Sequence, residues 1–197
     1  MNKKLKKNLI EYGLIGAVFI GLFVTGLHTE VFGFLQRGIL ATGLMDPDIE
    51  EKAEIASATP AKGAILDIGL VNSKGEKVNM EQFRGKVIFL NFWATWCPPC
   101  IAEMPGINNL YKEVKNDNVE FIMLSVDQNF EKAKKFKDKK GYGFEIYRAT
   151  GPIPQMYSTR SIPTTYVIDA DGNLALTHLG MGDFDTKDFK QFLQELQ

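Results

Sequence analysis

The two cysteines of the chain, Cys97 and Cys100, are separated by two prolines. An apolar, β-branched and aromatic segment over residues 86–92 precedes them and predicts a buried strand. Residues 98–115 carry apolar side chains at helical spacing, and they predict a helix that begins at the first proline. The cysteine pair is therefore expected where a strand ends and a helix begins.

This position favours thiol chemistry. Unpaired N–H groups and the positive end of the helix dipole stabilise an anion, so we expect a lowered pKa for the Cys97 thiol. Cys100 lies about one helical turn further on, close enough to form a disulfide with Cys97. The pair predicts a reversible dithiol, in which Cys97 attacks a substrate disulfide and Cys100 resolves the mixed disulfide. The alternative is a structural disulfide, whose short loop would constrain the chain little.

Composition narrows the remaining possibilities. A length of 197 residues leaves room for one domain and additional segments, and the formal net charge of −1 gives no indication of nucleic-acid binding. Ile101, not histidine, follows the second cysteine, which excludes the usual haem-attachment motif. Only His28 and His178 could complete a zinc site, and both are distant in sequence. We therefore predict no metal and no cofactor.

The N-terminal part of the chain resembles a membrane anchor in its composition. Residues 1–8 are basic and predict a cytoplasmic N-terminus, and residues 9–27 are mostly apolar. A helix over 9–27 would be roughly 28 Å long, near the thickness of a bilayer core. We expect a single-pass transmembrane helix there. A cleaved signal peptide is the alternative, but no Ala-x-Ala-like cleavage site follows the apolar run.

Residues 28–62 are predicted to be a membrane-proximal segment and linker. Val31 to Met45 form a second, weaker apolar segment, too short to span a bilayer. It is either a helix on the outer membrane surface or a connector packed on the domain. Residues 46–62 are charged and then rich in Ala, Ser, Thr and Pro, which is typical of a tether.

Residues 63–197 predict one α/β domain. A hairpin is expected over 65–71 and 77–79, followed by a short helical turn over 80–84. Beyond the cysteines the pattern predicts strands over 119–126, 144–148, 162–169 and 174–179, and helices over 130–140, 153–159 and 184–196.

The stretch from Asn91 to Cys100, Asn-Phe-Trp-Ala-Thr-Trp-Cys-Pro-Pro-Cys, resembles the signature of the thioredoxin superfamily. More narrowly, it is similar to that of the membrane-anchored thiol-disulfide oxidoreductases of the TlpA/ResA type. The resemblance extends from about Ile65 to the C-terminus. It implies a thioredoxin fold, with a central mixed sheet flanked by helices, an N-terminal β-hairpin extension and a preceding transmembrane helix.

The resemblance also implies roles for residues outside the cysteine pair. Pro163 matches the family's cis-proline, which would pack beside Cys97, and the backbone of Ile162 would pair with a bound substrate peptide. Glu103 would act as acid and base for the thiols, all the more because Asn91 stands where thioredoxin has a buried aspartate. The alternatives are a strand-entry proline and a first-turn glutamate that only favours the helix dipole.

Two tryptophans flank the junction. Trp96 is expected to form an apolar surface for substrate docking, whereas core packing is the stronger expectation for Trp93. His178 is expected to be a strand residue without a catalytic part.

These features predict a disulfide reductase in the cytoplasmic (inner) membrane, with its catalytic domain on the periplasmic side. The implied partners are the lipid bilayer, a membrane thiol-electron donor, and proteins with disulfides such as apocytochrome c. Alternatives are an oxidase, an isomerase or a thiol peroxidase of the same fold, and a non-catalytic membrane-tethered adaptor. Replacement of Cys97 distinguishes the adaptor from the enzymes, because an adaptor would keep its activity and an enzyme would lose it.

Overall fold

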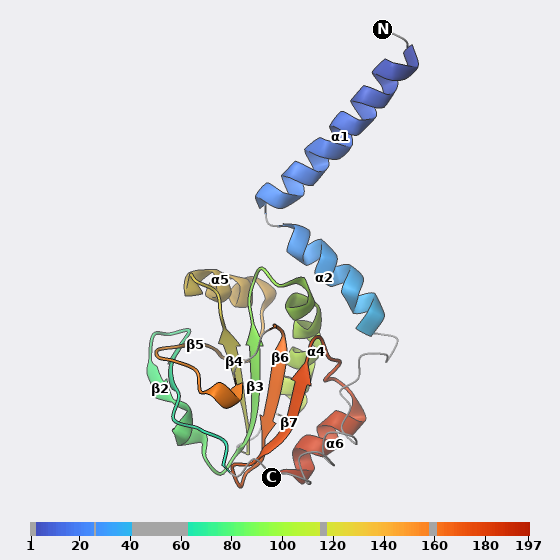
Figure 1. Cartoon of the computed structure of the whole chain (residues 1–197). Helices are drawn as coiled ribbons and strands as arrows, with labels where there is room; N and C mark the ends of the chain where they lie inside the picture. The colour runs from blue at the N-terminus through green and yellow to red at the C-terminus, as the bar shows by residue number, and fades with distance from the viewer. Residues whose placement is uncertain (1–2, 26, 41–62, 115–117, 158–160) are drawn as a thin grey trace.

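A computed structural model of the chain describes residues 3–25, 27–40, 63–114, 118–157 and 161–197 (Figure 1). The elements, with η marking short 3-10 turns, are α1 (Lys3–Thr25), α2 (Leu27–Leu40), β1 (Gly69–Asn72), β2 (Lys77–Asn79), η1 (Met80–Phe83), β3 (Val87–Trp93), α4 (Pro98–Val114), β4 (Val119–Ser125), α5 (Phe130–Lys140), β5 (Ile146–Ala149), η2 (Gln155–Tyr157), β6 (Thr164–Ile168), β7 (Leu174–Leu179) and α6 (Lys187–Glu195). The tether predicted over residues 46–62 lies outside the described residues, so the domain boundary at residue 63 stays a prediction.

The strands form one mixed sheet in the order β2-β1-β5-β4-β3-β6-β7. The three strands β3, β4 and β5 are parallel, whereas β6 runs antiparallel to β3, and β7 antiparallel to β6. Parallel neighbours require crossover helices, and α4 and α5 are these crossovers. The predicted α/β architecture is confirmed.

Strand β3 lies at the centre of the core because both of its faces are buried. Side chains alternate between the faces with a period of two. Phe89 and Trp93 join the apolar cluster that includes residues of α4 and α6, and Leu90 and Phe92 join the cluster on the other face. The sequence of this strand, apolar except for Asn91, follows from its two-sided burial.

The predicted hairpin is present and extends the sheet beyond β5. Leu70 of β1 pairs with Val78 of β2 on one side and with Ala149 of β5 on the other. The strand begins at Gly69 rather than at residue 65, because the N–H of Ile68 bonds to the nearby Leu66 carbonyl in a local turn.

The C-terminal helix is shorter than the predicted range of 184–196. Its N-cap is Thr186, whose hydroxyl accepts a hydrogen bond from the N–H of Phe189 at 3.2 Å. Phe184 therefore lies before the helix, where its ring packs edge-on against Phe89 with centroids 5.3 Å apart.

Two helices precede the domain. Most of the apolar run at 9–27 lies in α1, and α2 begins two residues after α1 ends. Within the described residues, no helix combines the length and the apolarity that crossing a membrane would require.

Candidate active site

The two cysteines meet at the junction of β3 and α4, as predicted. β3 ends at Trp93 and α4 begins at Pro98, so Cys97 directly precedes the helix. Cys97 and Cys100 are joined by a disulfide, with their Cα atoms 5.3 Å apart. The redox pair thus lies at the start of the helix, with Cys97 just before it and Cys100 in its first turn.

The sulfur of Cys97 is placed to carry negative charge. The N–H of Cys100 points at the Cys97 Sγ, with an N···S distance of 3.3 Å. When the disulfide is reduced, this N–H and the helix dipole stabilise the thiolate. Cys97 is 4% exposed, whereas Cys100 is fully buried. The outer sulfur is the one that a substrate can reach.

The segment before β6 lies beside the disulfide. Because β6 pairs with β3, the residues before Thr164 come close to the end of β3. The Ile162–Pro163 peptide bond is cis, as the resemblance implies. The carbonyl oxygen of Ile162 is 3.7 Å from the Cys97 Sγ. A peptide bound covalently at Cys97 would lie next to this stretch of backbone.

The two tryptophans occupy different environments. Trp96 is 59% exposed directly before Cys97, so its ring is an apolar surface next to the disulfide. Trp93 is fully buried, with its ring centroid 5.8 Å from that of Phe136. Of the two rings, that of Trp96 lies exposed beside the disulfide.

Asp127 anchors the loop that leads to the cysteines, and the sequence did not single it out. Its carboxylate accepts hydrogen bonds from the Thr95 N–H at 3.0 Å and from the Thr95 hydroxyl at 2.7 Å. The Ser125 hydroxyl also donates to it at 2.9 Å. Asp127 follows β4, the parallel neighbour of β3, so the strand ends bring this carboxylate to the active-site loop.

Glu103 is buried one helical turn beyond Cys100, with 1% of its surface exposed. The side-chain amide of Asn91 donates to its Oε1 at 2.9 Å, and the Gly182 N–H donates to its Oε2 at 3.2 Å. A first-turn role at the helix dipole is excluded, because the first turn of α4 holds no acidic residue. The carboxyl group instead points into the domain.

Burial raises the pKa of Glu103 to about 8, although the hydrogen bonds from Asn91 and Gly182 act in the opposite direction. A carboxyl group with this pKa gives up and takes back a proton near neutral pH, which suits an acid/base role. It lies on the same helix as the buried thiol of Cys100, which must lose its proton to attack.

Glu103 should make stability depend on pH. The pKa is about 8 in the folded protein against an ordinary value of 4.5, so between these values the folded state keeps a proton that the unfolded state releases. We expect the free energy of unfolding to fall with rising pH in this window, by up to about 1.4 kcal/mol per pH unit. Urea unfolding of the oxidised wild type and of Glu103→Gln measures the difference, since the variant should lack this slope.

The control is Glu195→Gln, which alters an exposed carboxylate on α6 and should leave the slope unchanged. Parallel pH curves for the wild type and Glu103→Gln would contradict a buried, protonated Glu103.

A row of polar residues on neighbouring strands lies beside Glu103 and includes one of its hydrogen-bond donors, Asn91. Asn91 of β3 lies opposite Thr165 of β6, which lies opposite His178 of β7. The Asn91 amide donates to the Thr165 hydroxyl at 2.9 Å as well as to Glu103. Thr165 was not singled out from the sequence, where its only signal is a polar side chain within an apolar strand. The hydrogen bond to Thr165 holds the Asn91 amide in the orientation that contacts Glu103.

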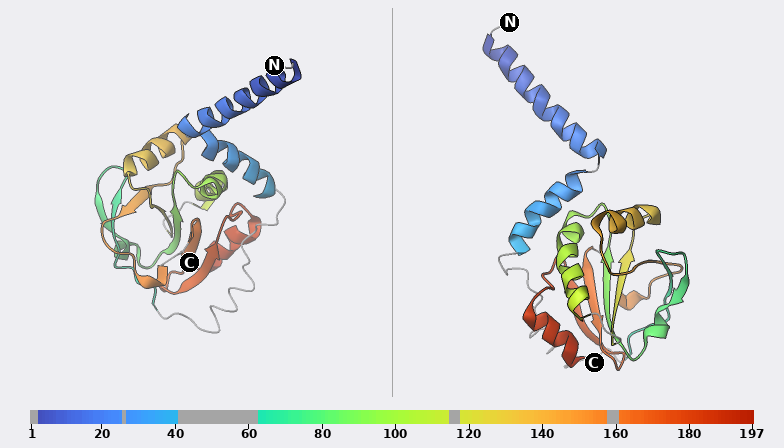
Figure 2. Two further views of the ribbon diagram at one scale, coloured as in Figure 1. Left: turned by 45° about the horizontal axis from the view of Figure 1, so that its top comes forward. Right: turned by 180° about the vertical axis from the view of Figure 1, so that it is seen from behind.

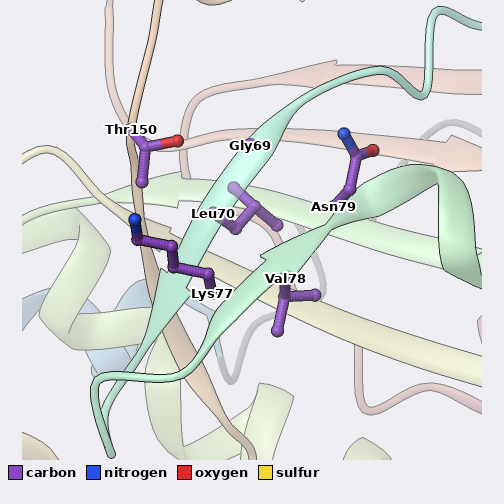
Figure 3. A pocket seen from close by; sticks show the side chains of 6 residues that line it. All are labelled: Gly69, Leu70, Lys77, Val78, Asn79 and Thr150. Atoms are coloured by element: carbon purple, nitrogen blue, oxygen red, sulfur yellow. The ribbon is translucent and has the colours of Figure 1, made fainter.

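A shallow pocket lies away from this site, at the hairpin formed by β1 and β2 (Figure 3). It is lined by Gly69, Leu70, Lys77, Val78, Asn79 and Thr150. Because it contains neither cysteine nor any part of α4, it takes no part in the chemistry of the disulfide.

Comparison with known proteins points to the same chemistry. Residues 61–177 match the AhpC/TSA family. The thiol-disulfide oxidoreductase ResA of Bacillus thuringiensis subsp. konkukian (strain 97-27) is 36% identical over 126 residues, which cover 64% of this chain and 69% of that protein. ResA of Geobacillus kaustophilus (strain HTA426) is 31% identical over 148 residues, which cover 75% and 82%.

A solved structure shares the fold. The thiol:disulfide interchange protein from Chlorobium tepidum TLS, a thioredoxin family protein, superposes with a TM-score of 0.55 and 29% sequence identity. The match covers 68% of this chain and 96% of that one. The expected thioredoxin fold, a mixed sheet flanked by helices, is thereby confirmed.

Proposed function

The chain belongs to the AhpC/TSA family and to the ResA-like thiol-disulfide oxidoreductases of the thioredoxin superfamily, and we propose that it reduces disulfides in proteins outside the cytoplasm. It is an enzyme of thiol-disulfide exchange, with Cys97 and Cys100 as its redox pair. The observation that carries the proposal is the disulfide at the start of α4, with its outer sulfur beside the Ile162 backbone.

The proposed cycle has two exchange steps. The Cys97 thiolate attacks the substrate disulfide, forms a mixed disulfide with one substrate sulfur and releases the other as a thiolate. The Cys100 thiol then loses its proton to Glu103 and attacks the Cys97 Sγ. This step releases the second substrate thiol and leaves Cys97 and Cys100 oxidised, so the enzyme supplies both electrons.

Substrate contacts are proposed for three residues around the outer sulfur. Trp96 supplies an exposed apolar ring, and the Ile162–Pro163 segment supplies backbone beside Cys97. This arrangement suits an extended peptide around a disulfide and places no demand on the side chains further along it. We propose secreted or periplasmic proteins with cysteines as the substrate class, with apocytochrome c as one candidate.

We further propose that residues 9–27 anchor the protein in the cytoplasmic membrane, with the domain on the periplasmic side. Several large apolar side chains of α1 are exposed; Leu14 is 64% exposed, Ile20 66% and Val24 82%. A lipid environment would cover these side chains. The lysines among residues 1–8 favour a cytoplasmic N-terminus. A reductant outside the cytoplasm needs electrons from inside, so the proposed donor is a membrane protein with a reactive dithiol.

The reduction potential of the Cys97–Cys100 pair tests the direction of the reaction. We expect a value nearer to that of thioredoxin, about −270 mV, than to that of a strong oxidant, about −120 mV. Equilibration of the protein with dithiol and glutathione buffers, followed by thiol trapping, gives the value. A potential near the oxidising end would contradict a reductant and favour the oxidase alternative.

A further inference from the structure

Helix α2 packs against the active-site helix α4. Figure 1 and Figure 2 show α2 lying alongside α4, between α1 and the sheet. The contact joins the segment directly after α1 to the helix that begins next to Cys97 and contains Cys100. The two faces of α2 differ in composition.

The inner face of α2 is a stripe of small and apolar residues at helical spacing. Thr29, Gly33 and Leu40 are buried, and they lie on one side of the helix because their spacing is four and seven residues. Leu40 packs in a cluster with Ala102 of α4 and Met181.

Gly33 is the point of closest approach between the two helices. A Cβ atom at this position would lie 3.3 Å from the Pro98 carbonyl oxygen and 3.3 Å from a methyl group of Ile101. Pro98 is the first residue of α4 and Ile101 is the fourth, so both lie at the start of this helix. The absence of a side chain at Gly33 therefore lets α2 lie directly against the cysteine end of the active-site helix.

The outer face of α2 is apolar and exposed. Val31 is 42% exposed, Phe32 52% and Leu35 61%. Val31 and Leu35 are one turn apart and lie on the side opposite Gly33, since each residue advances the helix by about 100°. We expect a helix that buries one face in the domain and exposes apolar residues on the other face to contact a second apolar partner.

The connection to α1 identifies that partner as lipid. α2 begins at residue 27, two residues after α1 ends, so its start lies within about 8 Å of the end of α1. Exposed apolar side chains are thus present both on α1 and on the outer face of α2. If α1 spans the bilayer, α2 must begin at the membrane surface, where an apolar outer face is covered by the headgroup and acyl-chain boundary.

We propose that α2 is an interfacial bracket, which lies on the membrane through Val31, Phe32 and Leu35 and holds the catalytic domain through Gly33. The bracket rests on the proposed anchoring by residues 9–27. It keeps the Cys97 end of α4 close to the membrane surface, within reach of a membrane-embedded dithiol donor. The disulfide would then stay near the electron donor, whereas a freely tethered domain would have to diffuse until it reached the donor.

The outer face can be tested with single labels in the full-length protein. Cys97 and Cys100 are the only cysteines and are joined, so one added cysteine is labelled selectively in the oxidised state. Fluorophores at Val18→Cys in α1, Leu35→Cys in α2 and Gln194→Cys, at an exposed position of α6, are compared. The protein is reconstituted in phosphatidylethanolamine and phosphatidylglycerol vesicles that contain brominated acyl chains. We expect several-fold stronger quenching at positions 18 and 35 than at position 194.

The pattern of quenching separates this inference from the anchoring on which it rests. Quenching at position 18 with none at position 35 would overturn the bracket and leave the anchor intact. A lack of quenching at both positions would overturn the anchor and the bracket together. Equal quenching at positions 35 and 194 would also overturn the bracket, because lipid contact would not be confined to α2.

The inner face is tested with a matched pair of glycine substitutions. Gly33→Leu should force α2 away from Pro98 and Ile101, whereas a Cβ at Gly38 meets no atom within 4 Å. Energy transfer from a label at Gln194→Cys to acceptors at the vesicle surface reports the orientation of the domain. We expect a broad distribution of distances for Gly33→Leu and a narrow one for the wild type and Gly38→Leu. Identical distributions for both leucine variants would overturn the bracket.

Discussion

Replacement of Cys97 by alanine is expected to lower disulfide reduction by about 10³-fold or more, because the remaining thiol, that of Cys100, is fully buried. Cys97 provides the outer sulfur of the pair, which receives the N–H contact from Cys100 and lies beside the Ile162 carbonyl. The measurement is the rate of reduction of a model disulfide protein such as insulin, with the enzyme reduced beforehand.

Cys100→Ala is the matched variant, because it removes the same disulfide and changes one sulfur atom. Cys97 still attacks in this variant, but the mixed disulfide cannot be resolved from within the enzyme. We expect substrate proteins to accumulate on Cys97 as adducts that are released by an added dithiol. Cys97→Ala should capture none under the same conditions, and the captured proteins identify the natural substrates.

Three results would contradict these roles. A Cys97→Ala protein with full biological activity would favour the non-catalytic adaptor. Capture by Cys97→Ala and not by Cys100→Ala would exchange the roles of the two cysteines. Rapid consumption of hydrogen peroxide by the reduced wild type would favour the thiol peroxidase alternative.

Glu103→Gln is expected to slow the resolution of the mixed disulfide by about 10²-fold at neutral pH, the usual size of an acid/base contribution. The first attack by Cys97 should change much less, because its thiolate is stabilised by the helix start and not by Glu103. Stopped-flow kinetics with a fluorescent disulfide peptide separate the two steps.

The pH profile distinguishes proton transfer from a structural effect. Below the Glu103 pKa of about 8, the carboxylate fraction grows about tenfold per pH unit, so the resolution rate should rise with pH and level off above 8. Glu103→Gln should lose the levelling near pH 8, since the amide does not titrate and the rate then depends only on proton loss from the Cys100 thiol to the solvent. Glu103→Asp keeps a carboxylate and should restore the pH-dependent limb in part.

A wild-type pH profile in Glu103→Gln would contradict the acid/base assignment and leave Glu103 a buried polar residue. Asn91→Ala offers a second check, because it removes a hydrogen bond that lowers the Glu103 pKa. Its pH-dependent limb should move to higher pH, while the two cysteines stay in place.

The sequence by itself determined the features that depend on near neighbours in the chain. The strand and helix around Cys97 follow from hydrophobic periodicity and from the prolines at the helix start. The hairpin follows from its turn residues, and the α5 range of Phe130–Lys140 agrees with the predicted 130–140. These signals are local, since each reports the energy of a segment within a few residues.

Only the tertiary structure decided which distant groups surround the reactive sulfur and its acid. The Ile162 carbonyl is 65 residues from Cys97, the Gly182 N–H is 79 residues from Glu103, and Gly33 meets the active-site helix from another segment altogether. Such contacts arise from strand order and from close packing between elements. The pKa of Glu103 depends on them, because the loss of hydration that raises it exists only when the packed domain encloses the carboxyl group.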